Sequence, residues 1–359
     1  MAFYKYILVL MIGLIFSSCN DDLAKKYEAK PVALGRMNEI VLLTDSKLEE
    51  GLVRDSFDFY FGSAFPIMPT PEPLFDIRHF TLLELEQEPL RKELRTYVLL
   101  ADISDTNSRA TKMVRSDLGE ERFRKAKEGL LNSSVGRDKW AKKQIIVYLF
   151  ADGQEALTKV IRDKFPAVAN RVNQHDKEQL STSIYAVRSD NPGLRKKIGD
   201  KFGIDLRIPG DFNVAINESD EKFIWLRKDT KDAILNMTVS TYPYSGPEML
   251  SKESISDLRD AYGKQYVTSS TDGSYMITNR KDLPMFEATE PLGDNYMKEV
   301  RGIWEMTKDY MGGPFVTYAI VNEAKQELVL VDVFVYAAGK TKRNYIQQLD
   351  YIVKESSIF

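Results

Sequence analysis

Short apolar runs alternate along the chain with segments in which apolar residues recur every three or four positions. In the first half, the apolar runs predict strands at residues 38–44, 78–85, 95–101 and 144–150. The helical spacing predicts helices at residues 47–61, 120–131 and 154–165. Because proline lacks a backbone donor, Pro166 is expected to interrupt the last helix, and a separate helix is expected over residues 167–176.

The second half of the chain is richer in strand patterns. Strands are predicted at residues 212–217, 223–227, 234–242, 275–279, 296–307, 315–322 and 327–337. Helices are predicted at residues 252–262 and 344–354, and at residues 192–202, where Pro192 opens the helix and Gly203 ends it.

This order of elements predicts an α+β fold with two subdomains. Each subdomain is expected to be a mainly antiparallel sheet with packed helices, in preference to a doubly wound parallel fold. At residues 203–211 the pattern changes, and the segments that follow are mostly of strand type. We therefore place an N-terminal subdomain at residues 37–205 and a C-terminal subdomain at residues 206–359. Residues 1–18 and 19–36 are assigned to a signal peptide and a flexible tether.

A proline-rich segment interrupts the first half at residues 65–75, with prolines at positions 66, 69, 71 and 73. Fixed φ angles and missing donors make this segment extended. It could dock in an aromatic groove as a ligand would. The simpler interpretation is a rigid connection that packs on its own domain through Phe65, Leu74 and Phe75.

The N-terminus has the order of a secretory signal: Lys5, an apolar run over residues 6–16, then Ser17 and Ser18 before Cys19. A spanning helix needs about 20 apolar residues, so this run is too short to remain as an anchor. Residues 16–19 resemble the lipobox of bacterial lipoproteins, in which the cysteine is acylated. Cys19 is the chain's one cysteine, so an internal disulfide cannot explain it. The alternative is an ordinary cleaved signal with an incidental cysteine.

Acylation of Cys19 would tie the chain to a membrane through its N-terminal lipid. Residues 20–22 (Asn-Asp-Asp) resemble the short acidic signal that sends lipoproteins to the outer face of the outer membrane. An ordinary solvated tether would look the same. We therefore expect an outer-membrane lipoprotein, and both the periplasmic face and the cell surface stay open.

Composition and charge exclude several classes of function. The formal net charge is −3, with 43% hydrophobic and 29% charged residues, which is the composition of a folded domain. Without a basic face or polybasic tail, no nucleic-acid partner is expected. A strand, loop and helix order surrounds Lys340 and Thr341, but Phe334 stands where a phosphate-binding loop has its first glycine, so no nucleotide is expected.

Catalytic and metal motifs are equally weak. The two histidines, His79 and His175, lie far apart in sequence and lack a matching ligand motif, so we expect no metal and no other cofactor. Glu84, Glu86 and Glu88 alternate, which on a strand would place them on one face as a Ca²⁺ site or an acid/base pair. The simpler role is the solvated face of an edge strand.

Two aromatic groups are the candidates for ligand or partner contact: Tyr242 with Tyr244, and Trp304 with Tyr310. Exposed Tyr and Trp rings stack on sugars or fill partner pockets. The alternative is that these rings belong to the core.

The chain also resembles an uncharacterised Bacteroidota lipoprotein family that is known as a domain of unknown function. The resemblance covers nearly the whole chain after the signal peptide and is carried by Cys19 and by residues 35–41, 69–80, 301–304 and 312–315. It implies the lineage and the compartment, and it supplies no catalytic residues.

The expected function is therefore non-enzymatic. We expect a lipid-anchored interaction or accessory subunit of an envelope complex, with an outer-membrane protein as partner and a role in outer-membrane protein assembly or export. The alternative is a glycan- or peptide-binding surface lipoprotein. A hydrolase that uses carboxylates such as Glu84 and Glu86 has the least support.

Overall fold

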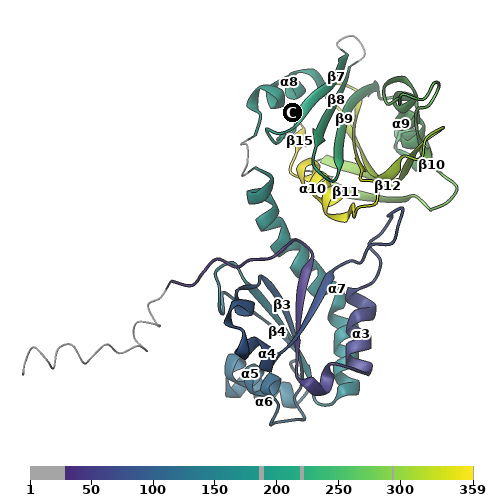
Figure 1. Ribbon diagram of the computed structural model, residues 1–359. Coiled ribbons are helices and arrows are strands. Elements are labelled where there is room, and N and C mark those ends of the chain that lie inside the picture. Colours follow the sequence, from purple (N-terminus) through teal and green to yellow (C-terminus); the bar gives the residue numbers. More distant parts are fainter. Residues whose placement is uncertain (1–28, 186–189, 219–221, 293–294, 359) are drawn as a thin grey trace, which may run out of the picture. The chain divides into compact units, whose positions relative to one another are not determined.

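The computed structural model describes residues 29–185, 190–218, 222–292 and 295–358. The predicted signal peptide, Cys19 and most of the predicted tether lie outside these residues. The described residues form two compact units: the first contains residues 29–35, 41–49 and 79–160, and the second contains described residues of the ranges 36–40, 50–78 and 161–358 (Figure 1). No helix among the described residues is both long and apolar enough to cross a bilayer.

A five-stranded sheet is the centre of the N-terminal part of the chain. Its strands, in spatial order, are β2 Asp76–Thr81, β1 Glu39–Thr44, β3 Thr96–Asp102, β5 Ile145–Ala151 and β4 Ser133–Arg137. The α+β class with two subdomains is confirmed, but the pairing predicted for this sheet needs correction. β1 pairs with β3, and β3 with β5, in parallel, while β4 joins the edge in antiparallel fashion.

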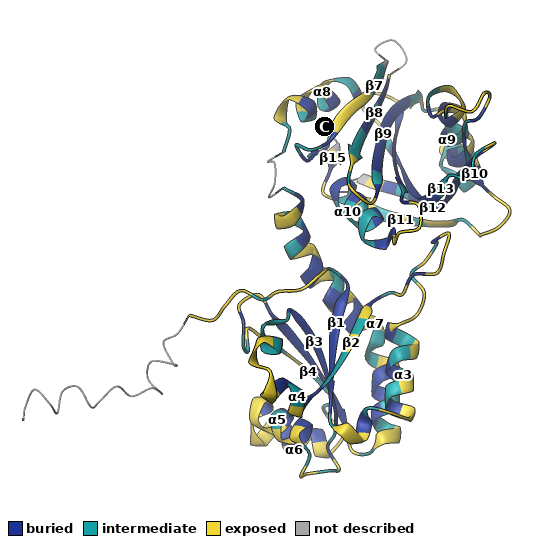
Figure 2. Ribbon diagram, viewed as in Figure 1, coloured by how far each residue is buried: buried dark blue, intermediate teal, exposed yellow. Residues whose placement is uncertain are grey.

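The reason for the parallel pairing is visible in the strands themselves. β1, β3 and β5 are buried along almost their whole length, and their sequences are continuous apolar runs (Figure 2). Strands buried on both faces are typical of parallel sheets, whereas a half-solvated antiparallel strand alternates apolar and polar residues.

Three further elements accompany the parallel strands in the first unit: α4 Leu82–Gln87, α5 Arg109–Leu118 and α6 Glu120–Lys127. The prediction of a strand over residues 78–85 is wrong in its second part, where α4 begins. Thr81 and Glu84 form a capping box, in which the Thr81 side chain accepts from the Glu84 N–H and Glu84 accepts from the Thr81 N–H. This local signal starts a helix at Leu82.

α7, Gln154–Ile184, is one helix of 31 residues that contains Pro166, so the predicted interruption is wrong. An interior proline costs a helix about 3 kcal/mol. Here the apolar side chains continue in helical spacing on both sides of it, with Val160 and Ile161 buried before Pro166 and Val168 and Val172 buried after it. Their burial offsets the lost backbone bond.

The second unit is built on an eight-stranded antiparallel sheet. Seven strands follow one another in the order β10 Met276–Asn279, β12 Asn295–Met306, β13 Gly312–Asn322, β14 Glu327–Tyr336, β9 Ile234–Pro243, β8 Phe223–Asp229 and β7 Asn213–Glu218, and β11 Phe286–Leu292 also pairs with β12. β10 and β11 pair with successive parts of β12, so residues 280–285 leave the sheet between them.

Alternating side chains divide the core of this unit between the two faces of the sheet. Val331 and Val333 of β14 belong to a cluster with residues of α8 Pro192–Phe202 and α10 Arg343–Lys354. Leu330 and Phe334 belong to a cluster with residues of α9 Lys252–Tyr266. Because successive side chains of a strand point to opposite faces of the sheet, β14 contributes residues to both clusters.

The remaining short elements are α3 Leu52–Phe61, η1 Ser46–Leu48, η2 Pro89–Glu93, η3 Pro247–Leu250, β6 Ile204–Asp205 and β15 Ser357–Ile358. The proline-rich segment follows α3 and packs within the second unit: Phe75 is buried, Phe65 packs against the cluster that contains α10, and Leu74 is half-buried. This agrees with the simpler of its two interpretations.

Candidate functional site

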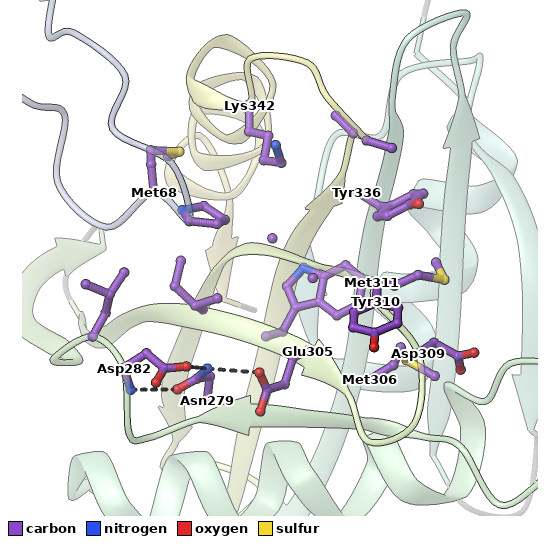
Figure 3. A pocket seen from close by; sticks show the side chains of 18 of the residues that line it. Met68, Asn279, Asp282, Glu305, Met306, Asp309, Tyr310, Met311, Tyr336 and Lys342 are labelled. Carbon is purple, nitrogen blue, oxygen red and sulfur yellow. Dashed lines mark hydrogen bonds between the residues drawn. The ribbon is translucent and has the colours of Figure 1, made fainter. Parts of the chain in front are cut away.

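A cleft of about 780 Å³ lies in the second unit (Figure 3). It is formed where β10, β12 and β13 meet the turn between β14 and α10. Its lining consists of Met68, Pro69, Pro71, Asn279, Asp282, Leu283, Ile303, Trp304, Glu305, Met306, Asp309, Tyr310, Met311, Gly312, Gly313, Tyr336, Ala337, Ala338, Gly339 and Lys342.

Trp304 lies in the floor of this cleft and is 2% exposed. Its indole Nε1 donates to the carbonyl oxygen of Val335 on β14 at 3.2 Å. The ring therefore passes over β13, the strand between them, where Gly313 lies opposite Trp304. A Cβ at Gly313 would lie 1.9 Å from the Val335 carbonyl oxygen and 3.1 Å from the indole nitrogen. Glycine is therefore required at this position for the strands and the ring to approach so closely.

Tyr310 lies at the rim, in the turn between β12 and β13, and its side chain is fully exposed at 108% relative accessibility. Of the lining methionines, Met68 comes from the proline-rich segment, and Met306 and Met311 come from the hairpin of β12 and β13. Methionine adapts its shape to a partner, and an exposed tyrosine gains much contact area on binding. This part of the cleft can receive an apolar group.

The polar side of the cleft is organised by Asn279, which is 8% exposed. Its side-chain oxygen accepts from the backbone N–H groups of Lys281 and Asp282. Its amide nitrogen therefore faces two carboxylates, donating to Asp282 at 2.6 Å and to Glu305 at 2.9 Å. The amide of Asn279 therefore holds the Asp282 and Glu305 carboxylates side by side.

A third carboxylate, Asp309, lies beside the exposed tyrosine. It accepts hydrogen bonds from the hydroxyls of Ser269, Thr271 and Ser274, each at 2.5 Å. These three donors lower the pKa of Asp309 below its ordinary value, so this group is ionised at neutral pH.

One wall of the cleft, with Met68, Pro69 and Pro71, belongs to the proline-rich segment. Buried Glu72 fastens this segment to α10, because its carboxylate accepts from the backbone N–H groups of Lys342 at 2.7 Å and Arg343 at 2.8 Å. The Arg343 guanidinium binds Asp76 at 2.7 Å. A carboxylate at a helix N-terminus satisfies free donors and the helix dipole together, so the wall is held in place.

The structure brings together two of the four aromatic residues predicted from the sequence. Trp304 and Tyr310 both line the cleft, whereas Tyr242 and Tyr244 are absent from its lining and pack, half-buried, against the cluster under α9. Burial raises the pKa of the Tyr242 phenol. Sequence reasoning missed Tyr336, Asn279, Asp282 and Glu305.

The three alternating glutamates do not share a strand face, so that interpretation is wrong. Glu84 serves the capping box of α4, and its bonds from Thr81 lower its pKa. Glu86 pairs with Arg109 at 2.6 Å, and Glu88 pairs with Arg91 at 2.9 Å. Helical geometry turns successive alternate residues away from one another, and Arg91 also lies 3.5 Å from Glu84.

The two histidines lie in structural positions. The His79 ring is 2.7 Å from the Thr44 hydroxyl, and His175 is 4% exposed within α7. In the part of the chain that the structure describes, no group of three or more His, Cys, Asp or Glu side chains could hold a metal ion.

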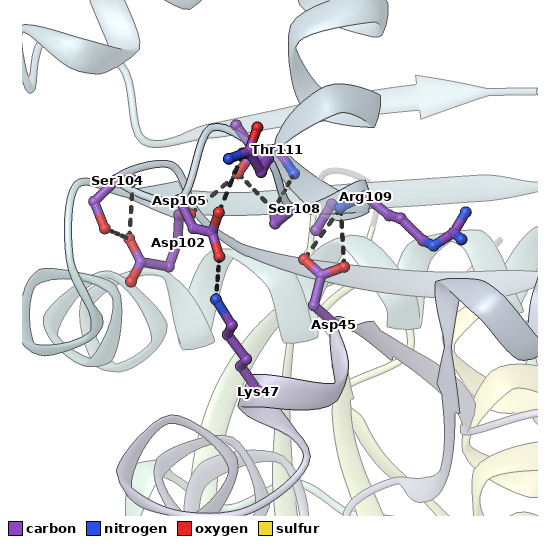
Figure 4. A network of polar contacts seen from close by, with 10 residues as sticks. Asp45, Lys47, Asp102, Ser104, Asp105, Ser108, Arg109 and Thr111 are labelled. Atoms are coloured by element: carbon purple, nitrogen blue, oxygen red, sulfur yellow. Dashed lines mark hydrogen bonds and ion pairs between the residues drawn. The ribbon is translucent and has the colours of Figure 1, made fainter.

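A second candidate is the edge of the first sheet where the parallel strands end, because ligands often bind there in open α/β sheets (Figure 4). Asp45 follows β1 and accepts from the backbone N–H groups of Arg109 and Ala110 at the start of α5. Asp105 pairs with Lys47 at 2.7 Å, and this bond lowers the pKa of Asp105. These side chains satisfy one another, so the edge is a weaker candidate than the cleft.

Comparison with known families divides the chain in two. Residues 33–185 match the family described as Domain of unknown function (DUF8532), and residues 191–355 match Domain of unknown function (DUF4837). The resemblance to a family known as a domain of unknown function is thereby confirmed. No curated protein matches the chain in sequence.

Solved structures with distant likeness to this chain include the following three. The Ran-binding protein Mog1p of Saccharomyces cerevisiae is 10% identical, with 44% of this chain and 90% of that protein covered and a TM-score of 0.28. LpqN of Mycobacterium tuberculosis, described as involved in cell envelope biogenesis, is 11% identical, with 43% and 82% covered and a TM-score of 0.27. The lipid transfer and protein localization domain of human StarD13 is 12% identical, with 45% and 92% covered and a TM-score of 0.21. Likeness at this level says nothing about function.

Proposed function

We propose that this chain of two domains of unknown function is a non-enzymatic interaction or accessory subunit of an envelope complex. Acyl chains on Cys19 hold it at the outer membrane, and the cleft of the second unit receives a segment of its partner, an outer-membrane protein. A role in outer-membrane protein assembly or export fits this arrangement.

The observation that carries the proposal is the cleft itself. Its volume of about 780 Å³ lies in the range of ligand pockets, and the fully exposed ring of Tyr310 stands at its rim. Aromatic anchors beside adaptable methionines are typical of binding surfaces.

The role of the cleft is tested by Tyr310→Ala, with Tyr296→Ala as the matched control. Tyr296 is also largely exposed, at 73%, and does not line the cleft. After gentle detergent extraction and affinity purification, Tyr310→Ala is expected to recover at least about tenfold less partner, as for loss of an interface hot spot. Equal recovery by the two variants, or recovery of the native chain without a partner, would count against the proposal.

The anchor is tested by Cys19→Ser and by mass spectrometry of the native N-terminus. Each buried methylene contributes about 0.8 kcal/mol to membrane binding, so two or three acyl chains make the attachment effectively permanent. The native chain is expected to begin with an acylated Cys19 and to sediment with membranes, and the serine variant is expected to lose both properties. A bare thiol at Cys19 would contradict the anchor and leave the test of the cleft unaffected.

Glycan binding is the second candidate, because an exposed ring such as Tyr310 beside carboxylate and amide groups also suits a sugar. In that case soluble oligosaccharides, rather than a protein, would compete for the cleft.

A further inference from the structure

The charges that line the cleft are unbalanced. The lining contains three carboxylates, Asp282, Glu305 and Asp309, and Lys342 as its basic residue. Among the described residues, no cation lies within 4.0 Å of any of these three carboxylates. Lys342 is 9% exposed, and its ammonium donates to the carbonyl oxygen of Lys340 at 2.9 Å. The cleft therefore has an excess of negative charge that no described cation neutralises.

Two of these charges are held where one cation can reach both. Asn279 lies opposite Ile303 in the β10–β12 pairing, so Glu305, two residues further along β12, is on the same face. The single amide nitrogen of Asn279 donates to both Asp282 and Glu305, as Figure 3 shows. A cationic group that enters the cleft beside this pair would form charge-assisted hydrogen bonds with both carboxylates.

Apolar and aromatic groups line the same cleft as the acidic pair. Tyr310 is fully exposed and Tyr336 and Met311 are partly exposed, whereas Trp304, whose ring centroid lies 6.4 Å from that of Tyr336, is buried. Aromatic faces attract cations, and rings and thioethers cover alkyl stems. The cleft thus combines an apolar surface with a negatively charged side, which complements an ammonium or guanidinium on an apolar stem.

We propose that the occupant is a lysine or arginine side chain of an extended segment of the partner protein, with apolar residues on both sides of it. The cation binds between Asp282 and Glu305, and the flanking residues contact the aromatic rings and methionines. The cleft volume of about 780 Å³ exceeds that of one side chain severalfold and Tyr310 is fully exposed at the rim, which favours a peptide over a small free amine. This inference rests on the proposed role of the cleft and adds the chemistry of the partner.

The test uses the full chain in detergent and three fluorescent peptides of equal length. Each has phenylalanine and leucine flanks, and the central residue is lysine, glutamine or glutamate. By fluorescence anisotropy, the lysine peptide is expected to bind about tenfold more tightly than the glutamine peptide, and the glutamate peptide more weakly still. Asp282→Asn with Glu305→Gln is expected to abolish this preference and leave binding of the glutamine peptide unchanged.

The matched control is Asp272→Asn with Glu323→Gln, which removes two charges from exposed positions outside the cleft. It has the same net charge as the test variant and is expected to retain the preference for lysine. The comparison therefore distinguishes the effect of the Asp282 and Glu305 carboxylates from the effect of the protein's net charge. Melting temperatures of both double variants are measured to confirm that they fold.

The outcomes separate this inference from the proposed function. If the three peptides bind with equal affinity and Tyr310→Ala weakens the binding of all three, the cleft binds partners without a preference for positive charge. In that case the inference alone is overturned. The same holds if none binds although the native chain still recovers its partner through Tyr310. If no peptide binds and Tyr310→Ala recovers as much partner as the native chain does, both the inference and the proposed function fail.

Discussion

Replacing Arg259 by leucine is expected to lower the free energy of unfolding of the second unit by about 3–5 kcal/mol. Arg259 of α9 and Asp332 of β14 are both 0% exposed and form an ion pair at 3.2 Å. Asp332 also accepts from the hydroxyls of Thr317, at 2.6 Å, and Tyr262. Leucine would leave the Asp332 carboxylate buried without its cation, and it would remove the guanidinium that lies 4.0 Å from the centre of the Phe315 ring.

The measurement is denaturant unfolding followed by tryptophan fluorescence, because Trp225 and Trp304 both lie in the second unit. Arg280→Leu is the control: Arg280 pairs with Asp257 and Asp260 at the surface, where an ion pair contributes less than about 1 kcal/mol. Replacing both buried partners, Arg259→Met with Asp332→Leu, is expected to recover much of the loss. Equal effects of Arg259→Leu and Arg280→Leu would contradict the burial of this pair.

Trp304→Ala is expected to lower the free energy of unfolding by about 3–5 kcal/mol, as for a large aromatic residue lost from a core. The indole is nearly inaccessible and packs against Phe334 with ring centroids 5.5 Å apart. Tyr310→Ala, by contrast, is expected to change stability by less than about 0.5 kcal/mol, because its side chain is fully exposed. Urea titration of the two variants beside the native chain measures both effects.

This contrast decides how the cleft can be studied. A loss of binding by Trp304→Ala would report damage to the floor, whereas a loss by Tyr310→Ala would report a missing contact. If Trp304→Ala proved as stable as the native chain, Trp304 would not be the buried floor of the cleft.

Local patterns in the sequence predicted most elements of the second unit. The helix expected at residues 192–202 is α8 with the same bounds, because Pro192 and Gly203 mark its two ends. Parallel pairing of β1, β3 and β5 was not predicted, because it depends on which strands meet in space. The continuous apolar runs of these strands were the signal for it.

The site was harder to predict than the fold. Trp304 and Tyr310 were chosen for their chemistry, and the same reasoning chose Tyr242 and Tyr244, which the fold places elsewhere. The acidic pair depends on the register of β10 against β12, which brings Asn279 beside Glu305 although 26 residues separate them. In the sequence, the consecutive Gly312 and Gly313 were the one local indication that neighbouring atoms lie too close to β13 for a side chain.

The central claim is that the partner lies in the cleft of the second unit. It is tested most directly by placing the photo-crosslinking residue p-benzoylphenylalanine at position 310 in living cells, with position 296 as the control. One dominant crosslinked partner is expected from position 310, absent from position 296 and competed by the lysine peptide. Crosslinks of equal yield from both positions, or none from position 310 while the complex is intact, would contradict it.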